Sequence, residues 1–313
     1  MNAEEALKRL GIRIGHKSDE EAGTGCSVFL FDEPPVAGVS VRGGAPASHE
    51  TELLRAGRLI ERIHGLLLTG GSAYGLCAAS GVMRYLEERG IGHDTGVCVV
   101  PIVPAAAIYD LKYKTHTVRP DASWGYEASL RASYTVKEGS VGAGCGATIG
   151  KILGTEHASK GGFGMCVTEC AGICVVAFAV VNALGEVVDE NGRIVAGIRK
   201  RDGFIASFDA MKSVTEGMLA GENTTLVVVA TDMPLTKGMS VRLADVAHNG
   251  VAMAVRPAHT PFDGDTVFAL SCSTGKQVDD PRMLMLLFAT AEVTVRKAII
   301  RAATGEKYNP NNC

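Results

Sequence analysis

Residues 221–232, GENTTLVVVATD, carry two threonines directly in front of an apolar run. The run from Leu226 to Ala230 predicts a buried β-strand, because consecutive apolar residues rich in valine favour the interior of a sheet. The polar residues Asn223, Thr224 and Thr225 then form the entrance to that strand. They are either the ordinary polar start of a strand or a place where a threonine takes part in chemistry.

Strand and helix patterns alternate on both sides of this strand. Apolar and β-branched runs predict further strands at 26–32, 35–43, 63–71, 162–169, 173–183 and 265–273. Apolar residues at helical spacing predict helices at 72–90, 120–133, 236–257 and 280–304. No connection between them has the composition of a linker. The sequence therefore predicts one α/β domain over residues 1–313, with two sheets covered by helices.

The composition excludes two classes of partner. The chain has 313 residues, 46% of them hydrophobic, and a formal charge of −3, so no basic field is available to bind a nucleic-acid backbone. No apolar run reaches the ~18 residues that a membrane span needs. The amino terminus is acidic and has no apolar segment before a small-residue cleavage site. We expect a cytoplasmic protein that binds neither nucleic acid nor membrane.

Neither the cysteines nor the glycine motifs predict a metal or a cofactor. The nine cysteines are scattered, and the closest group, Cys166, Cys170 and Cys174, lacks both CxxC spacing and a nearby histidine. The segment GAGCGATIGK, residues 142–151, contains neither a phosphate-binding loop nor a dinucleotide fingerprint. In GSAYG, residues 71–75, the serine is second and not central, so Ser72 fits a helix N-cap better than a nucleophile elbow.

The entrance to the strand has the residues that a self-cleaving bond needs. If the backbone is strained there, the Thr224 hydroxyl can attack the Asn223 carbonyl, move the acyl group from nitrogen to oxygen, and leave the ester to water. A threonine freed in this way carries its own base, because an α-amine with a reference pKa near 7.7 to 8.0 accepts the hydroxyl proton at neutral pH. The alternative is a polar strand start with no chemistry.

A pair of carboxylates lies downstream, in RPAHTPFDGDTVFALS, residues 256–271. Asp263 and Asp265 are separated by one glycine directly before a predicted strand, so both could face Thr224 from a neighbouring strand. Two carboxylates in one pocket repel each other, which raises the pKa of one of them or requires hydrogen-bond donors to hold it. The alternative is an Asp-Gly turn with a cap.

Six blocks of the chain, taken together and in order, resemble one family. They are LLLTGGSAYGL, VPIVPAAAIYDL, GSVGAGCGATIGK, VVNALGEVVD, NTTLVVVATD and AVRPAHTPFDGDTVFAL, and the similarity runs from about residue 12 to residue 300. The family is that of the self-processing L-aminopeptidases/D-esterases, with the β-peptidyl aminopeptidases and the nylon-oligomer hydrolases. The resemblance implies a four-layer αββα sandwich like that of the N-terminal-nucleophile hydrolases, no cofactor, and assembly as a homotetramer.

The resemblance also implies the position of the cut and the nucleophile. The precursor would cleave itself between Asn223 and Thr224, giving an α chain of residues 1–223 and a β chain of residues 224–313 that stay together. Thr224 would be the nucleophile, and Asp263 and Asp265 would lie beside it. An asparagine and a threonine at the cut are more similar to the nylon-oligomer hydrolases than to the branch that cuts before serine.

Three further residues match polar pocket positions of the family. Lys151 and Asn182 would polarise the substrate carbonyl or hold the oxyanion, and the hydroxyl of Tyr109 would contact substrate. The function predicted is hydrolysis of small amide or peptide substrates through an acyl-enzyme. One alternative is an acyltransferase of the ornithine acetyltransferase type, although its Ala-Thr-Met-Leu cut site is replaced here by residues 223–226, NTTL. Another is an unprocessed, inactive homologue.

Overall fold

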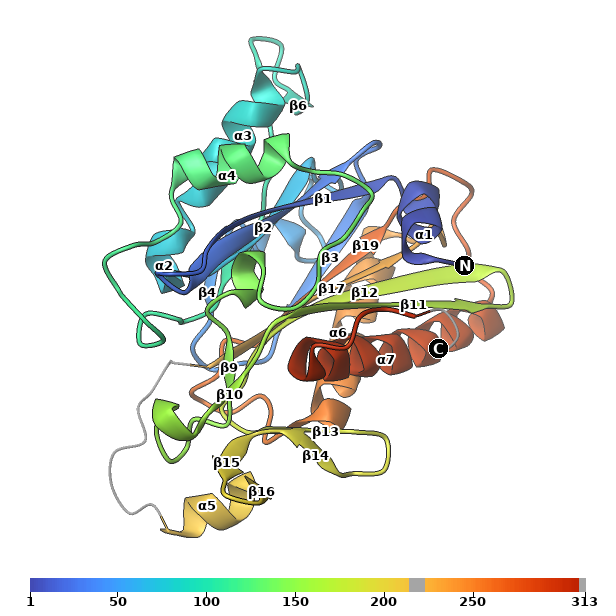
Figure 1. Ribbon diagram of the computed structural model, residues 1–313. Helices are drawn as coiled ribbons and strands as arrows, with labels where there is room; N and C mark the ends of the chain where they lie inside the picture. Colours follow the sequence, from blue (N-terminus) through green and yellow to red (C-terminus); the bar gives the residue numbers. More distant parts are fainter. Residues whose placement is uncertain (214–222, 310–313) are drawn as a thin grey trace.

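The computed structural model describes residues 1–213 and 223–309. Two five-stranded sheets pack against each other, and helices cover their outer faces (Figure 1). Each sheet is mixed, since each contains one parallel pair of strands among antiparallel ones. The predicted αββα sandwich is confirmed.

The first sheet has the strand order β1-β2-β5-β8-β4. Its strands are Ile12–Asp19 (β1), Thr24–Phe31 (β2), Gly65–Thr69 (β5), Ala105–Ala107 (β8) and Ala47–His49 (β4). The helices Ala78–Glu87 (α3) and Ala122–Leu130 (α4) cover its outer face (Figure 1). They approach closely because Gly81 and Gly125 lie in the contact. A Cβ at Gly81 would fall 1.7 Å from the Ala122 carbonyl oxygen.

The predicted helix over 72–90 is wrong in its first part. The structure has a short helix, Ser72–Gly75 (α2), followed by α3, and Gly71 occupies the N-cap position predicted for Ser72. Ser72 itself has a positive φ of 54°, and its N–H donates to the Ile108 carbonyl. The turn is set by Asp110, whose carboxylate accepts the Gly71 N–H at 2.7 Å, so a tertiary contact displaced the local cap.

The first helix and the first strand were not predicted from the sequence. Helix Ala3–Leu10 (α1) begins with a capping box in which Asn2 accepts from the Glu5 N–H and Glu5 accepts from the Asn2 N–H. Strand β1 follows it directly after Gly11 and pairs along its length with β2. The helix is short, and its stability depends on packing Leu7 and Leu10 into the core.

The second sheet has the order β11-β12-β17-β19-β3. Its strands are Phe163–Cys170 (β11), Ile173–Asn182 (β12), Thr224–Thr231 (β17), Thr266–Ser271 (β19) and Val36–Val41 (β3). The hairpin of β11 and β12 and the strand β17 lie where the sequence predicts them. The helices Lys237–Ala254 (α6) and Pro281–Thr304 (α7), both predicted, cover the outer face of this sheet (Figure 1).

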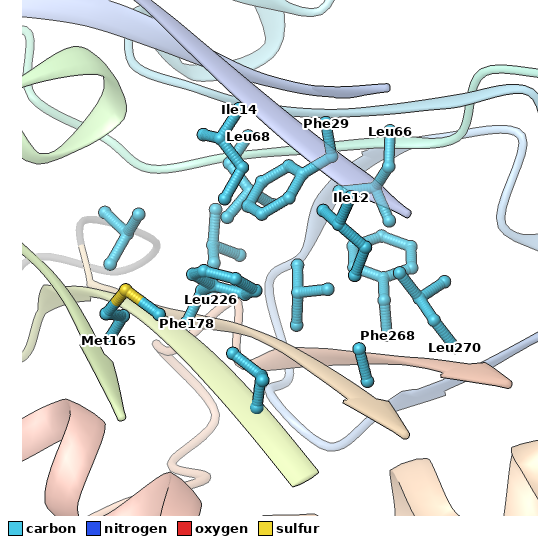
Figure 2. Close-up of a cluster of buried hydrophobic side chains, with 14 of the residues drawn as sticks. Ile12, Ile14, Phe29, Leu66, Leu68, Met165, Phe178, Leu226, Phe268 and Leu270 are labelled. Carbon is cyan, nitrogen blue, oxygen red and sulfur yellow. The ribbon is translucent and has the colours of Figure 1, made fainter. Parts of the chain in front are cut away.

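Strand β17 is buried on both faces. Leu226, Val228 and Ala230 point into the core between the two sheets, which Figure 2 shows with Phe29 and Phe178 among its residues. Val227 and Val229 point the other way, into the core under α6 and α7. The continuous apolar run of the sequence therefore reflects a strand in the middle of the sandwich. A third core lies between the first sheet and α3 and α4.

The remaining elements are short. They are the strands His93–Asp94 (β6), Val99–Val100 (β7), Thr148–Ile149 (β9), Ser159–Lys160 (β10), Glu186–Val188 (β13), Ile194–Ala196 (β14), Ile198–Lys200 (β15), Gly203–Ile205 (β16) and Val255–Arg256 (β18), the helix Ser207–Ser213 (α5), and the 3-10 turns Glu52–Leu54, Gly142–Gly144 and Thr155–His157. Within the described residues no helix is long and apolar enough to cross a membrane.

Candidate active site

Three neighbouring strands bring four of the predicted residues, Thr224, Asn182, Asp263 and Asp265, together at one end of the second sheet. Thr224 is the first residue of β17 and pairs with Asn182, the last residue of β12, in an antiparallel ladder. On the other side β17 runs parallel to β19, and an isolated bridge joins Asn223 to Asp263. Thr224 is therefore flanked by an amide side chain on one strand and by the Asp263–Asp265 segment on the other.

The hydroxyl of Thr224 contacts the carbonyl group of the peptide bond that precedes it. Its Oγ1 donates to the Asn223 carbonyl oxygen at 2.5 Å. The same oxygen accepts the main-chain N–H of Gly264 at 2.8 Å. Asn223 and Thr224 are 2% and 4% exposed, so this peptide bond is shielded from bulk water.

Asp265 is held by three donors. Its Oδ1 accepts the Thr225 N–H at 2.7 Å, and its Oδ2 accepts the main-chain N–H of His259 at 3.0 Å. The His259 ring nitrogen Nδ1 lies 2.8 Å from the same Oδ2. Both oxygens of this buried carboxylate are thus engaged, and one of them fixes the backbone directly after Thr224. Asp265 therefore holds the start of β17 in position.

Asp263 differs from Asp265 in its surroundings. Its Oδ2 accepts the Thr260 N–H at 2.7 Å, and the residue is 3% exposed. Burial, followed by repulsion from the Asp265 carboxylate, raises the pKa of Asp263 to about 6. A carboxyl with a pKa near neutrality can take up and release protons under physiological conditions. The repulsion between two neighbouring carboxylates is the effect that the sequence predicts.

His259 is a site residue that the sequence reasoning missed. It has a left-handed backbone with φ of 60°, uncommon for a residue with a side chain, and it binds Asp265 with both its main chain and its ring. The ring of His248 stands edge-on to it, with centroids 4.7 Å apart. Burial is the main cause that lowers the pKa of His248 to about 4, so that ring is neutral at pH 7. The signal in the sequence was a histidine in the same short loop as both aspartates.

Lys151 and Asn182 form the opposite side of the site. Lys151 Nζ donates to the Asn182 main-chain carbonyl at 2.9 Å and to its side-chain Oδ1 at 2.8 Å. The same Oδ1 accepts the Thr148 N–H at 3.1 Å. Asn182 Nδ2 donates to the Tyr109 main-chain carbonyl at 3.0 Å. The structure thus joins these three predicted residues in one network next to Thr224, while their roles toward a substrate remain predictions.

The site is made of hydroxyl, carboxylate, amide and ammonium groups. In the part of the chain that the structure describes, no group of three or more histidine, cysteine or acidic side chains is arranged to hold a metal ion. Cys166 and Cys174 are buried in the β11–β12 hairpin, and Cys170 is half-buried at its end. The chemistry available here is nucleophilic attack on a carbonyl, with proton transfer by side chains.

Comparison with known proteins identifies the family. The model of peptidase family S58 matches residues 10–307, nearly the whole chain. The chain belongs to peptidase family S58. As a member of a peptidase family it is expected to hydrolyse amide bonds, and its curated relatives agree with this.

Two groups of relatives of this S58 peptidase are informative. An uncharacterised aminopeptidase of Mycobacterium tuberculosis (strain ATCC 25618 / H37Rv) is 42% identical over 281 residues, which cover 83% of this chain and 79% of that protein. A 6-aminohexanoate-oligomer endohydrolase of Paenarthrobacter ureafaciens is 30% identical over 282 residues, which cover 87% of this chain and 75% of that protein. The resemblance to aminopeptidases and nylon-oligomer hydrolases is therefore confirmed.

Solved structures of other proteins have the same fold as this S58 peptidase. A Burkholderia sp. beta-aminopeptidase superimposes with a TM-score of 0.70 over 93% of this chain and 84% of that one, at 22% identity. The L-aminopeptidase D-Ala-esterase/amidase of Ochrobactrum anthropi, described as a variant of the Ntn hydrolase fold, gives 0.69 over 93% and 83%, at 18% identity. At these identities the similarity establishes the architecture.

Proposed function

We propose that this S58 peptidase cleaves itself between Asn223 and Thr224 and then uses Thr224 as an amino-terminal nucleophile on small amide substrates. The observation that carries the proposal is the 2.5 Å contact between Thr224 Oγ1 and the Asn223 carbonyl oxygen, in a buried site flanked by two carboxylates. A hydroxyl that contacts the preceding carbonyl oxygen is close to the carbonyl carbon, which is the atom that an acyl shift attacks.

The cleavage proceeds in two steps. Thr224 Oγ1 bonds to the Asn223 carbonyl carbon, the bond from that carbon to the Thr224 nitrogen breaks, and the hydroxyl proton is transferred to the released amine. A water molecule then adds to the ester, the carbon–Oγ1 bond breaks, and Oγ1 regains a proton. The products are a carboxylate on Asn223 and a free α-amine on Thr224.

The two carboxyl groups have separate tasks in this scheme. Asp265 binds the Thr225 N–H and so fixes the nucleophile through its neighbour. Asp263, with its raised pKa, exchanges protons during the acyl shift. In the cleaved enzyme the α-amine of Thr224 takes the hydroxyl proton, because its reference pKa is close to neutrality.

Cleavage also opens the site. Asn223 is buried against Gly264 in the intact chain, so a substrate reaches Thr224 only after the new carboxyl end of Asn223 moves away. The two fragments remain one folded unit, because β12 of the first pairs with β17 of the second along eight residue positions. Residues 1–223 and 224–313 therefore form one hydrolase domain.

The names of the relatives and the groups in the site support small amides as the substrate class. Hydrolysis would attach the acyl group of a short peptide, amino-acid amide or ω-amino-acid oligomer to Thr224 Oγ1, with Lys151 and Asn182 binding the carbonyl oxygen and Tyr109 contacting the substrate. Water then releases the acid without a cofactor. Assembly as a homotetramer in the cytoplasm completes the proposal, and light scattering of the purified protein tests the tetramer.

A denaturing gel with intact mass measurement tests the cut. The purified wild type should give two fragments that begin at Met1 and Thr224, whereas Thr224→Ala should stay a single chain. A folded wild type that remains uncut would support the inactive-homologue alternative and contradict the proposal.

A substrate panel tests the hydrolysis. Amino-acid p-nitroanilides and 6-aminohexanoate oligomers, each assayed with and without an added amine acceptor, separate aminopeptidase, oligomer hydrolase and acyltransferase. We expect acid products whether or not the acceptor is present. Product formed only with the acceptor would favour the transferase alternative.

A further inference from the structure

The peptide bond of the proposed cut already has a hydrogen-bond donor on its carbonyl oxygen. The Gly264 N–H donates to the Asn223 oxygen at 2.8 Å, from the side of β19, while Thr224 Oγ1 reaches the same oxygen from within β17. During the acyl shift this oxygen gains negative charge as the carbonyl becomes tetrahedral. A donor that is in place beforehand stabilises that charge without having to reorient.

We propose that Gly264 is a catalytic residue of the self-cleavage, acting through its main-chain N–H as the oxyanion donor and through its missing side chain as the space for the nucleophile. The inference rests on the proposed function, because it concerns the step that this function requires. It assigns a role to a main-chain group on the β19 side of Thr224.

The N–H of Gly264 is held in direction by a neighbouring loop. The carbonyl of Asp263 accepts the Ala45 N–H at 2.8 Å, and the carbonyl of Asp265 accepts the N–H groups of Arg42 and Gly43 at 3.1 and 3.3 Å. Main-chain groups alternate in direction along an extended segment. Because the carbonyls on both sides of Gly264 face residues 42–45, its own N–H faces β17 and the Asn223 carbonyl.

A side chain at residue 264 would push against the Thr224 hydroxyl. A Cβ built on Gly264 would lie 2.7 Å from Thr224 Oγ1, which is closer than real Cβ contacts. The next nearest atom, the Ala45 carbonyl oxygen, is 3.2 Å away, a distance at which a small shift suffices. A side chain at this position would therefore displace mainly the Thr224 oxygen, the proposed nucleophile.

The direct test replaces the amide of residue 264 by an ester, with glycolic acid introduced in place of glycine by nonsense suppression. This change removes the N–H and adds no side chain. We expect self-cleavage to slow about 10²–10³-fold, the usual effect of removing one oxyanion donor. The rate is measured by intact mass after synthesis, and thermal melting confirms that the chain folds.

The matched control is the same exchange at Ala45, with lactic acid. It removes the Ala45 hydrogen bond to the Asp263 carbonyl, a bond that the ester at 264 also weakens, and it leaves the Gly264 N–H intact. We expect a slowing of less than about 10-fold, because only positioning is affected. Equal slowing in the two esters, or wild-type cleavage in the 264 ester, would overturn the role of the N–H and leave the proposed function standing. A wild type that does not cleave would overturn both.

Gly264→Ala tests the role of the missing side chain, and it remains a test of the proposal if the ester variant does not fold. In the chain that keeps Thr224, we expect this substitution to slow cleavage strongly. In the Thr224→Ala chain, where the oxygen is absent, it should change the melting temperature by only about 1–3 °C. Cleavage of Gly264→Ala at the wild-type rate would contradict the proposal.

Discussion

On the β12 side of Thr224, Asn182 lies in a regular ladder and is bound by the Lys151 ammonium group. On the β19 side, the groups come from a segment outside the regular strand, where two carboxylates flank a glycine N–H that binds the Asn223 carbonyl. The β12 side thus offers cationic and amide side chains, and the β19 side offers carboxylates and a main-chain donor. The difference suggests that the β19 side serves the chain's own cleavage and the β12 side serves the bound substrate.

The largest expected effect concerns the residue between the two sides. Thr224→Ala removes Oγ1, the oxygen that attacks the Asn223 carbonyl carbon in the proposed mechanism. Self-cleavage should therefore fall below detection, a loss of more than about 10⁴-fold. Thr225→Ala is the control, because Thr225 is the next residue and is equally buried. It should still be cut, as judged by intact mass. Cutting of Thr224→Ala at residue 224 would contradict the assignment.

The next largest effect is expected for a substitution on the β19 side. Asp265→Asn exchanges a carboxylate that accepts from Thr225 and His259 for an amide that must turn a donor toward one of them. We expect self-cleavage to slow about 10²–10³-fold through misplacement of Thr224. Asp209→Asn, which changes the same charge at an exposed pair with Lys212, should leave the rate within about 3-fold. Equal rates for both variants would remove Asp265 from the mechanism.

Lys151→Met tests whether the two sides serve different reactions. The ammonium group contacts Asn182 and is not needed to hold the Gly264 N–H, so the chain should still cut itself within about 10-fold of the wild-type rate. Hydrolysis of amide substrates should fall about 10²-fold. Each reaction acts as the control for the other. A parallel loss of both would show that the two sides work as one unit.

A smaller effect is expected on stability, measured in the uncut Thr224→Ala chain. The pKa of Asp263 is raised to about 6 from an ordinary value of 3.8, so between these pH values the folded chain keeps a proton that the unfolded chain has lost. The contribution of Asp263 to stability therefore declines as the pH rises through this window. Asp263→Asn, neutral throughout, should raise the melting temperature by about 2–6 °C at pH 7 and by little at pH 4. The same increase at both pH values would contradict the raised pKa.

The smallest effect is expected for Asn223→Ala. The side-chain Oδ1 of Asn223 is buried and has no hydrogen-bond partner among the described residues. The groups that act on the cut belong to its main chain, which alanine retains. Self-cleavage should stay within about 3-fold of the wild-type rate, measured by the same mass assay. A loss of more than 10-fold would show that the asparagine side chain takes part.

Much of this site was predictable from the sequence, and the parts that were not predictable have physical reasons. The run 226–230 predicted the buried strand, and the resemblance of the blocks predicted Thr224, Asp263 and Lys151 in one place. The roles of His259 and of the Gly264 N–H were not predicted. A main-chain donor has no residue type to recognise, and its direction depends on hydrogen bonds to residues 42–45, far away in the sequence. In the same way, Asp110 reshaped the start of the predicted helix at 72–90.

The most direct test of Thr224 as the nucleophile of both reactions is a mass spectrum of the enzyme, quenched in acid while it turns over a slow amino-acid ester. We expect a fragment that begins at Thr224, part of it heavier by the acyl group, with the added mass located on Thr224. An intact chain, or an acyl group on any other residue, would contradict this assignment.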